Sequence, residues 1–191
     1  NTLNPLNQLI ILTISLVWAS VGMAQDEEIH LSESLDVKTL YQPIASLEVH
    51  GDTAVSLLEE LETKHYRAVE VDDSFSSAIF DSLIDTLDGS HSYFLRSDID
   101  ELSKFRYTLD DSLKSGSVEP GFEIYNTYYK RVLERLIYAI NRIENNIPQM
   151  DFSVDEYIQL DREDAPYAES IADLDEIWRL RIKNSVLSLR L

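Results

Sequence analysis

The chain contains no cysteine among its 191 residues. This absence excludes disulfide bonds, thiolate zinc sites and cysteine nucleophiles together. Glycine and proline are also scarce, at five residues each. No segment alternates apolar and polar residues with the two-residue period of a strand. We therefore expect an all-α fold, an irregular multi-helix bundle of about five to six helices joined by short turns.

Basic side chains are the minority among the charged residues. Sixteen lysines and arginines stand against 35 aspartates and glutamates, which gives a formal net charge of -19. Such a surface repels nucleic-acid phosphates and anionic lipid headgroups, so we predict no nucleic-acid partner. Hydrophobic residues make up 44% of the chain and recur periodically. This content is typical of one folded domain and not of a disordered acidic segment.

The N-terminus carries the longest apolar run, "LIILTISLVWASVGMA" from Leu9 to Ala24. It is short for a bilayer-spanning helix, and it ends in small residues followed at once by the hydrophilic "QDEE". We predict a signal peptide over residues 1–24, cleaved between Ala24 and Gln25, whose basic n-region is truncated. The alternative is an uncleaved membrane anchor. The last residues stop inside a helical pattern, so we expect truncation at both ends.

The remainder divides into an arm and a helical domain. Residues 25–52 have only a weak apolar pattern, which predicts an N-terminal arm with one short helix. Residues 53–191 are predicted to form the domain. Its first helix runs from Thr53 to about Tyr66, and its second begins near Asp73 with an apolar stripe at four-residue spacing. That stripe consists of Phe75, Ile79, Leu83 and Leu87, widened by Ala78, Phe80 and Ile84, and Gly89 is expected to end the helix in a left-handed cap.

Three further helices follow from the same periodicity. One is predicted from Ser97, with Asp100 closing its first turn, to Gly116. A long helix from Glu119 to before Pro148 is expected to bury the side formed by Phe122, Tyr125, Tyr129, Val132, Leu133, Leu136, Ile140 and Ile143. The stretch 151–170 is irregular because Pro166 interrupts it. A final helix from about Ala172 is anchored by Leu174, Ile177, Trp178 and Ile182.

The strongest candidate for nucleophilic catalysis is Ser90 or Ser92 beside His91 in "LDGSHSYF". Neighbours in sequence seldom face one another for proton transfer, and one turn glycine does not form an oxyanion hole. We therefore favour a structural interpretation. In it Asp88 and Ser90 accept backbone donors at the helix end, while Tyr93, Phe94 and Leu95 pack into the core.

Other polar clusters are weaker candidates. His65 and His91 are distant in sequence and lack the close spacing of a metal-binding pair. The acidic pairs Asp72/Asp73 and Asp110/Asp111 are predicted to lie solvated at helix ends or outward faces. An aromatic series could form a stacking platform, but helical spacing makes it core: Phe122, Tyr125, Tyr128, Tyr129 and Tyr138. We predict no catalytic, metal-binding or cofactor-binding residue, and no cofactor.

A series of motifs resembles one known family in order. It consists of "HYR" (65–67), "DDSFSSAIFDSLIDTLDGSHSYFLRSDIDEL" (72–102), "LKSG" (113–116), "YNTYYKRVLERLIYAI" (125–140), "MDF" (150–152), "LDREDAPY" (160–167) and "IWRLRIKNSVLSLRL" (177–191). Over residues 53–191 the chain resembles the N-terminal helical domain of the periplasmic tail-specific protease, also called the carboxy-terminal processing protease.

The resemblance implies a modular serine endopeptidase that degrades or processes proteins from their C-terminal tails. In this family a PDZ domain and a peptidase domain with a serine and lysine pair follow, so the catalytic residues would lie beyond Leu191. Lys104, Lys114 and Lys183 are not assigned that role, and the fragment alone is expected to be inactive. The helical domain would support substrate access and protein contacts.

The resemblance also implies partners and a location. Protein substrates with accessible C-terminal tails would bind through the domains that follow, and relatives offer the helical domain to a helical adaptor lipoprotein. The implied location is the periplasm, in association with the periplasmic face of the inner membrane. Two alternatives remain: a stand-alone secreted helical protein-binding module without enzymatic activity, and a metallohydrolase using His65 and His91.

Overall fold

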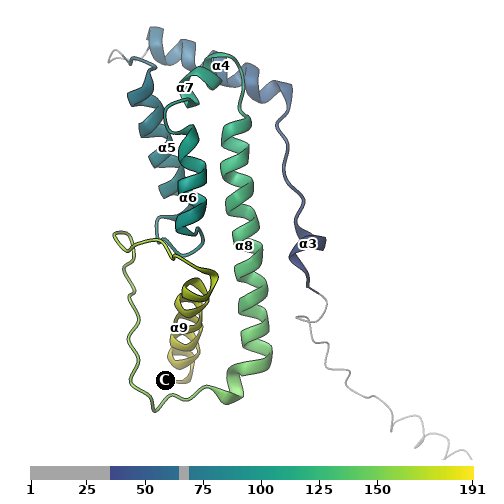
Figure 1. Cartoon of the computed structure of the whole chain (residues 1–191), viewed down its shortest axis with the longest axis vertical. Coiled ribbons are helices and arrows are strands. Elements are labelled where there is room, and N and C mark those ends of the chain that lie inside the picture. Colours follow the sequence, from purple (N-terminus) through teal and green to yellow (C-terminus); the bar gives the residue numbers. More distant parts are fainter. Residues whose placement is uncertain (1–34, 65–68) are drawn as a thin grey trace, which may run out of the picture. The chain divides into compact units, whose positions relative to one another are not determined.

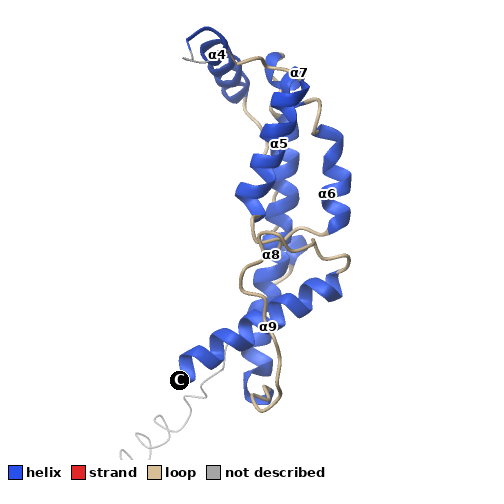
Figure 2. Cartoon of the chain, turned by 90° about the vertical axis from the view of Figure 1, so that its left-hand side faces the viewer, coloured by secondary structure: helices blue, strands red, loops and turns tan. Residues whose placement is uncertain are grey.

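A computed structural model describes residues 35–64 and 69–191 of the chain (Figure 1). The predicted signal peptide, its cleavage site at Ala24 and Gln25, and His65 lie outside these residues. The described elements are α3 (Val37–Leu40), α4 (Glu48–Lys64), α5 (Asp73–Asp88), α6 (Arg96–Leu102), η1 (Ser103–Phe105), α7 (Leu109–Lys114), α8 (Glu119–Asn146), η2 (Ile147–Gln149) and α9 (Ile171–Arg190). None of them is a strand (Figure 2), which confirms the predicted all-α class.

The long helix α8 is the element against which most others pack. Helices α5 and α6 lie along one half of it and α9 along the other half (Figure 1). The main core lies between α5, α6, α7 and α8, and its buried members are Phe80, Ile84, Phe94, Leu102, Leu109 and Ile124. A smaller cluster of Leu95, Ala168 and Leu174 joins α9 to the turn before α6. No described helix is long and apolar enough to cross a membrane.

Helix α4 begins at Glu48, five residues before the predicted start at Thr53. Gly51 was expected to belong to the arm, but it is buried inside α4. It lies against the backbone of Gly116, so α4 packs on the chain just after α7 at a point where neither residue has a side chain. The arm retains the expected short helix, α3.

The buried ridge of α5, its most buried line of residues, runs along one side of the predicted stripe. Its members are Ser76, Phe80, Ile84 and Asp88, at four-residue spacing; Phe80 and Ile84 belong to the predicted stripe, whereas its central positions Phe75, Ile79, Leu83 and Leu87 are half-buried. Two polar residues occupy the ends of this ridge because each bonds to backbone. Ser76 Oγ accepts the N–H of Leu109 at 2.8 Å, and Asp88 accepts three N–H groups of the following turn. Apolar periodicity therefore identified the apolar side of α5 but not the buried polar residues Ser76 and Asp88.

The predicted left-handed cap at Gly89 is wrong. Gly89 has φ -59° and ψ -12°, which is right-handed helical geometry. The chain reverses instead at His91, with φ 45°. The carboxylate of Asp88 makes this possible, because it accepts the N–H groups of Ser92, Tyr93 and Phe94 at 2.8, 3.0 and 2.8 Å.

The single helix predicted over 97–116 is divided into α6, η1 and α7. Helix α6 starts at Arg96. Asp98, rather than the predicted Asp100, closes its first turn by accepting the N–H of Leu95 at 2.9 Å. The interruption falls at residues 106–108, where Arg106 reaches to Asp81 of α5 at 2.7 Å. The N–H of Leu109 then bonds to a side chain of α5 instead of continuing the helix. This division raises the number of helices above the predicted count.

Three of the eight residues predicted to form the buried side of α8 are exposed, and the other five are half-buried. Tyr125, Leu136 and Ile143 are 39%, 49% and 48% exposed, while Ile124 and Arg135 are buried. The inward side carries long polar side chains that are paired, as Arg135 is with Asp175 of α9. Such side chains bury their stems while their charged ends bond to partners, so hydrophobic spacing does not identify this face.

The segment 151–170 is irregular, as predicted, and α9 follows it from Ile171. The segment is fixed to the turn before α6 by an isolated bridge between Leu95 and Ala168, with Arg96 N–H bonded to the Ala168 carbonyl at 2.9 Å. Leu174 and Ile182 are buried, and Ile177 and Trp178 pack on the small cluster. These four are the anchors that the sequence predicted.

Candidate functional site

An apolar groove of about 480 Å³ lies between α5, α7 and the first turns of α8. Its lining consists of Ile44, Ile79, Leu83, Leu109, Leu113, Ser117, Val118, Pro120, Gly121, Phe122 and Tyr125. The sequence predicted several of these residues as core. Leu83 packs against the main core and also lines the groove, whereas Tyr125 is exposed. We call the surface that these residues line the apolar groove.

The segment between α3 and α4 runs alongside α8 at this groove (Figure 1). Asn126 of α8 pairs with the backbone of Ile44 at both ends of its amide. Its Oδ1 accepts the Ile44 N–H and its Nδ2 donates to the Ile44 carbonyl, each at 2.8 Å. A neighbouring β-strand would offer a peptide the same pair of hydrogen bonds, one with its N–H and one with its carbonyl. Helix α8 therefore holds a non-helical segment by its backbone while the Ile44 side chain lines the groove.

Polar contacts fix the arm on either side of Ile44. The ring of Tyr41 lies 5.8 Å from that of Tyr129, and Ser46 Oγ donates to Glu119 at 3.1 Å. Hydrogen bonds from hydroxyl groups, Ser117 first, lower the pKa of Glu119. Glu119 therefore stays charged at the N-terminal end of α8, where the helix dipole favours an anion. Nothing in the sequence pattern pointed to Asn126 or to this arm contact.

The candidate nucleophiles do not face a base. Ser90 Oγ donates to Ser92 Oγ at 3.1 Å, and Ser92 Oγ donates to the Ser90 carbonyl at 2.9 Å. The ring of His91 bonds to the Ala165 carbonyl. The structure thus directs His91 away from both hydroxyl groups and into a contact with the irregular segment.

The turn at residues 88–94 is the structural feature that the sequence predicted in part. Asp88 accepts backbone donors as expected, whereas the Ser90 hydroxyl bonds to Ser92 instead. Burial raises the pKa of Asp88, and the three backbone N–H donors oppose that shift. Phe94 is fully buried and Tyr93 half-buried, in agreement with their predicted packing.

His91 packs against the irregular segment through its ring as well. Its ring centroid lies 3.9 Å from that of Tyr167, with the planes tilted by 27°. Burial raises the pKa of Tyr167 to about 12, and the charges of Asp88, Asp85 and Asp81 add to that shift. His65, the other histidine of the metallohydrolase alternative, lies outside the described residues. Among the described residues, no three His, Asp or Glu side chains gather as metal ligands.

Three of the four aspartates in the acidic pairs lie exposed as expected, and Asp110 does not. Asp72 caps α5 by accepting the N–H of Phe75 at 3.0 Å, and Asp73 is exposed. Asp111 is exposed, but Asp110 is 3% exposed, so its predicted outward position is wrong. Its Oδ2 pairs with Lys114 at 3.2 Å and its Oδ1 has no partner.

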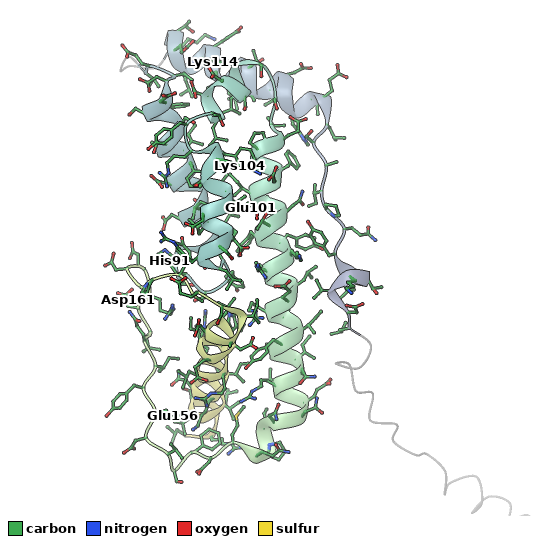
Figure 3. The ribbon with its side chains drawn as sticks, viewed as in Figure 1. His91, Glu101, Lys104, Lys114, Glu156 and Asp161 are labelled. Carbon is green, nitrogen blue, oxygen red and sulfur yellow. The ribbon has the colours of Figure 1, made fainter. Side chains whose placement is uncertain are left out.

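Lys104, Lys114 and Lys183 each pair with a different acidic residue, and Figure 3 labels the first two of these lysines. Lys104 pairs with Glu123 at 2.6 Å, Lys114 with Asp110 at 3.2 Å, and Lys183 with Glu156. The aromatic series on α8 splits likewise. Tyr125 is exposed at the groove, while its other members are half-buried: Phe122, Tyr128, Tyr129 and Tyr138.

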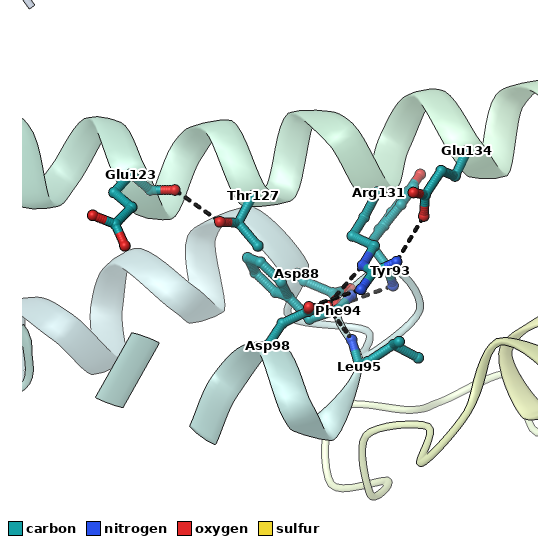
Figure 4. Close-up of polar contacts among 9 residues, drawn as sticks. All are labelled: Asp88, Tyr93, Phe94, Leu95, Asp98, Glu123, Thr127, Arg131 and Glu134. Carbon is teal, nitrogen blue, oxygen red and sulfur yellow. Dashed lines mark hydrogen bonds and ion pairs between the residues drawn. The ribbon is translucent and has the colours of Figure 1, made fainter. Parts of the chain in front are cut away.

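An ion-pair network that the sequence did not predict joins α6 to α8. Asp98 binds Arg131 through both carboxylate oxygens, and Arg131 also binds Glu134 at 2.8 Å (Figure 4). The hydrogen bonds to Asp98 are the main cause of a raised pKa of Arg131. The network therefore joins the N-terminal end of α6 to the middle of α8.

Two comparisons with known proteins find relatives of this chain. The family model described as the tail-specific protease N-terminal domain matches residues 57–191. The tail-specific protease of Haemophilus influenzae is 39% identical over 132 residues, which cover 69% of this chain and 19% of that protein. The chain therefore spans about a fifth of the length of this relative.

Proposed function

Because this chain belongs to the family of the tail-specific protease N-terminal domain, we propose that it is the non-catalytic helical module of a periplasmic endopeptidase acting on proteins from their C-terminal tails. The family predicted from the motif series is confirmed by both matches. In this proposal the parent is a serine endopeptidase whose serine and lysine lie outside residues 1–191. The module serves substrate access and protein contacts.

The observation that carries this role is the way α8 holds residue 44 over the apolar groove. Asn126 satisfies the backbone N–H and carbonyl of Ile44, and the isoleucine side chain lines the groove. Backbone bonds of this kind do not depend on the sequence of the bound segment, whereas an apolar groove selects for apolar side chains. The arrangement suits an unfolded polypeptide, which offers both.

The net charge of the chain indicates which polypeptides would bind at the apolar groove. A formal charge of -19 repels acidic segments and attracts basic ones. We therefore propose that the groove receives apolar residues flanked by lysine or arginine in an extended chain. A protease that must act on loosely held proteins would benefit from such a surface before the tail reaches the catalytic domain.

A binding measurement tests this role. A fluorescent unstructured peptide with leucines flanked by lysines should bind, and the same peptide with serines in place of the leucines should not. Leu113→Gln and Tyr125→Gln should each weaken binding about tenfold, which corresponds to about 1.4 kcal/mol. Tyr157→Gln is the matched control, because Tyr157 is 91% exposed and does not line the groove. Equal affinity for all variants would refute the groove as the binding surface.

The proposed parent activity has its own test. The isolated chain should leave a protein with an apolar C-terminal tail intact, while a longer product of the same gene should cleave it. The codons that follow Leu191 should encode a PDZ domain and a peptidase domain. A stop codon directly after Leu191 in an intact gene would contradict the parent enzyme.

The proposed location and partners follow from the N-terminal run and the family. We propose cleavage after Ala24, residence in the periplasm beside the inner membrane, and contact with a helical adaptor lipoprotein. N-terminal sequencing of the periplasmic product should begin at Gln25. Retention of residues 1–24 in the membrane fraction would indicate an uncleaved anchor instead.

A further inference from the structure

A second, smaller pocket of about 180 Å³ lies away from the apolar groove, where the turn after α5 and the irregular segment meet α9. Its lining consists of Ser90, Ser92, Ile158, Gln159, Leu160, Arg162, Arg181, Asn184 and Ser185. These residues supply two guanidinium groups, three hydroxyls and two amides. No carboxylate lines the pocket.

The two guanidinium groups have donors without acceptors. Among the described residues, Arg162 Nη2 donates to the His91 carbonyl at 3.3 Å, and its Nε is buried without a partner. Arg181 lies over the Trp178 ring at 5.1 Å, and its Nη1 is buried without a partner. Within residues 35–64 and 69–191 neither arginine forms an ion pair. Buried donors without acceptors are rare because each has lost its hydrogen bonds to water without a replacement.

The two positive charges are also close enough to oppose each other. Burial lowers the pKa of Arg162, and the charge of Arg181 lowers it further. Asp88 acts in the opposite direction, but its carboxylate already accepts three backbone N–H groups. Asp161, the residue before Arg162, is exposed and accepts the N–H of Glu163 at 3.3 Å. The nearby acids therefore do not neutralise the pocket.

A neighbouring arginine on the same helix is a useful contrast. Arg179 is bound by Glu176 at 2.7 Å and by Glu156, so its charge is balanced. Arg181, two residues further along, has no such partner. From Ile177 to Leu191 the chain carries four basic residues and no acidic one. The chain as a whole carries a net charge of -19. The basic stretch makes the pocket a local positive site, which attracts an anion.

We propose that this pocket binds one carboxylate group of a polypeptide, held by Arg162 and Arg181. Guanidinium groups bind planar carboxylates through paired hydrogen bonds, and serine hydroxyls and the Asn184 amide can donate to the same oxygens. Ile158 and Leu160 line the same pocket, and they would contact the carbon chain of an amino acid, which inorganic anions lack. The carboxylate can belong to an aspartate or glutamate side chain or to a chain terminus.

The test uses the intact 191-residue chain and follows the indole N–H of Trp178 by NMR. This N–H donates to the Ser92 carbonyl at 2.7 Å, and Arg181 lies over the ring, so its resonance reports on the pocket. N-acetyl-leucine offers a terminal carboxylate, and N-acetyl-glutamate α-amide offers a side-chain carboxylate. At least one should cause a saturable shift, and the tighter of the two identifies the source. N-acetyl-leucinamide, which lacks the charge, should cause none.

Variants separate the pocket from general charge attraction. Arg162→Gln and Arg181→Gln should each weaken carboxylate binding about tenfold. Arg190→Gln is the matched control on the same helix and should bind as the original chain does, because Arg190 is not part of the pocket. Failure of the intact chain to distinguish carboxylates from the amide would overturn the proposal, as would binding of inorganic phosphate alone. Neither result depends on peptide binding to the apolar groove.

Discussion

Asp98 and Arg131 meet through two parallel contacts, from Oδ2 to Nε and from Oδ1 to Nη2, each 2.8 Å long. The same Oδ2 accepts the N–H of Leu95 at 2.9 Å, at the start of α6. One carboxylate therefore caps α6 and joins it to α8. Both side chains are largely buried, at 10% and 17% exposure, so water does not replace the contact.

Asp98→Ala should lower the free energy of unfolding by about 2–4 kcal/mol. The substitution removes the helix cap and leaves the guanidinium of Arg131 with Glu134 as its remaining partner. Urea unfolding followed by circular dichroism measures the change. Asp100→Ala is the matched control, because Asp100 forms an exposed pair with Arg96 and its loss should change stability by less than about 0.5 kcal/mol. Equal effects of the two substitutions would contradict the double role of Asp98.

The position of the buried ridge on α5 predicts different effects at two adjacent residues. Ile84 is 6% exposed in the main core, whereas Leu83 is half-buried and lines the apolar groove. Ile84→Ala should lower the free energy of unfolding by about 2–5 kcal/mol, because it leaves a cavity in the core. Leu83→Ala should cost about half as much. A larger loss at Leu83 would mean that Leu83 rather than Ile84 occupies the main core.

The sequence could predict most helices because their apolar spacing and end residues are local properties. It correctly placed α5, α8 and α9 and the irregular segment before α9. It could not identify the inward side of α8, because Arg131 and Arg135 are buried there only through Asp98 and Asp175, which come from other helices. The reversal at His91 was missed for a similar reason, since the carboxylate of Asp88 rather than a glycine stabilises it.

The candidate sites were less predictable than the helices. The apolar groove needs Ile44 and Asn126, which are 82 residues apart and carry no motif. The carboxylate pocket needs side chains from the turn after α5, the irregular segment and α9. A sequence does not reveal which arginines lack an acidic partner, because ion pairs depend on how the chain folds.

Tyr167 should make the domain lose stability at high pH. Its pKa is raised from 10.0 to about 12 in the folded chain. Between these values the unfolded chain releases a proton that the folded chain keeps, so the free energy of unfolding falls as the pH rises. Below about pH 10 the group contributes its full stabilisation. At about pH 11 the loss should be up to roughly 1 kcal/mol, after allowance for solvent screening at this half-buried ring.

Tyr167→Phe removes the ionisable group and retains the ring that stacks on His91. Urea unfolding at about pH 9 and about pH 11 should therefore show a smaller decrease for the variant than for the original chain. The difference between the two chains cancels the contribution of lysines and other tyrosines. An identical decrease in both would mean that Tyr167 ionises at its ordinary pKa in the folded state.

Glycine-to-alanine substitutions at Gly51 in α4 and at Gly121 in α8 should change stability in opposite directions. The reason is that Gly51 contacts the backbone of Gly116. A Cβ atom at Gly51 would overlap the carbonyl oxygen of Gly116, a backbone atom that cannot swing aside. Gly116 has φ 76°, so its own conformation also resists adjustment. Gly51→Ala should therefore destabilise the domain by about 1–3 kcal/mol, although alanine is the better helix former.

Gly121→Ala is the matched control in α8, because a Cβ atom there meets nothing within 4 Å. This substitution should raise the free energy of unfolding by about 0.5–1 kcal/mol through reduced backbone entropy of the unfolded chain. Thermal and urea unfolding of both variants measure the two changes. Stabilisation by both substitutions would mean that α4 does not pack on Gly116 in solution, and that the arm leading into α4 is free to leave the apolar groove.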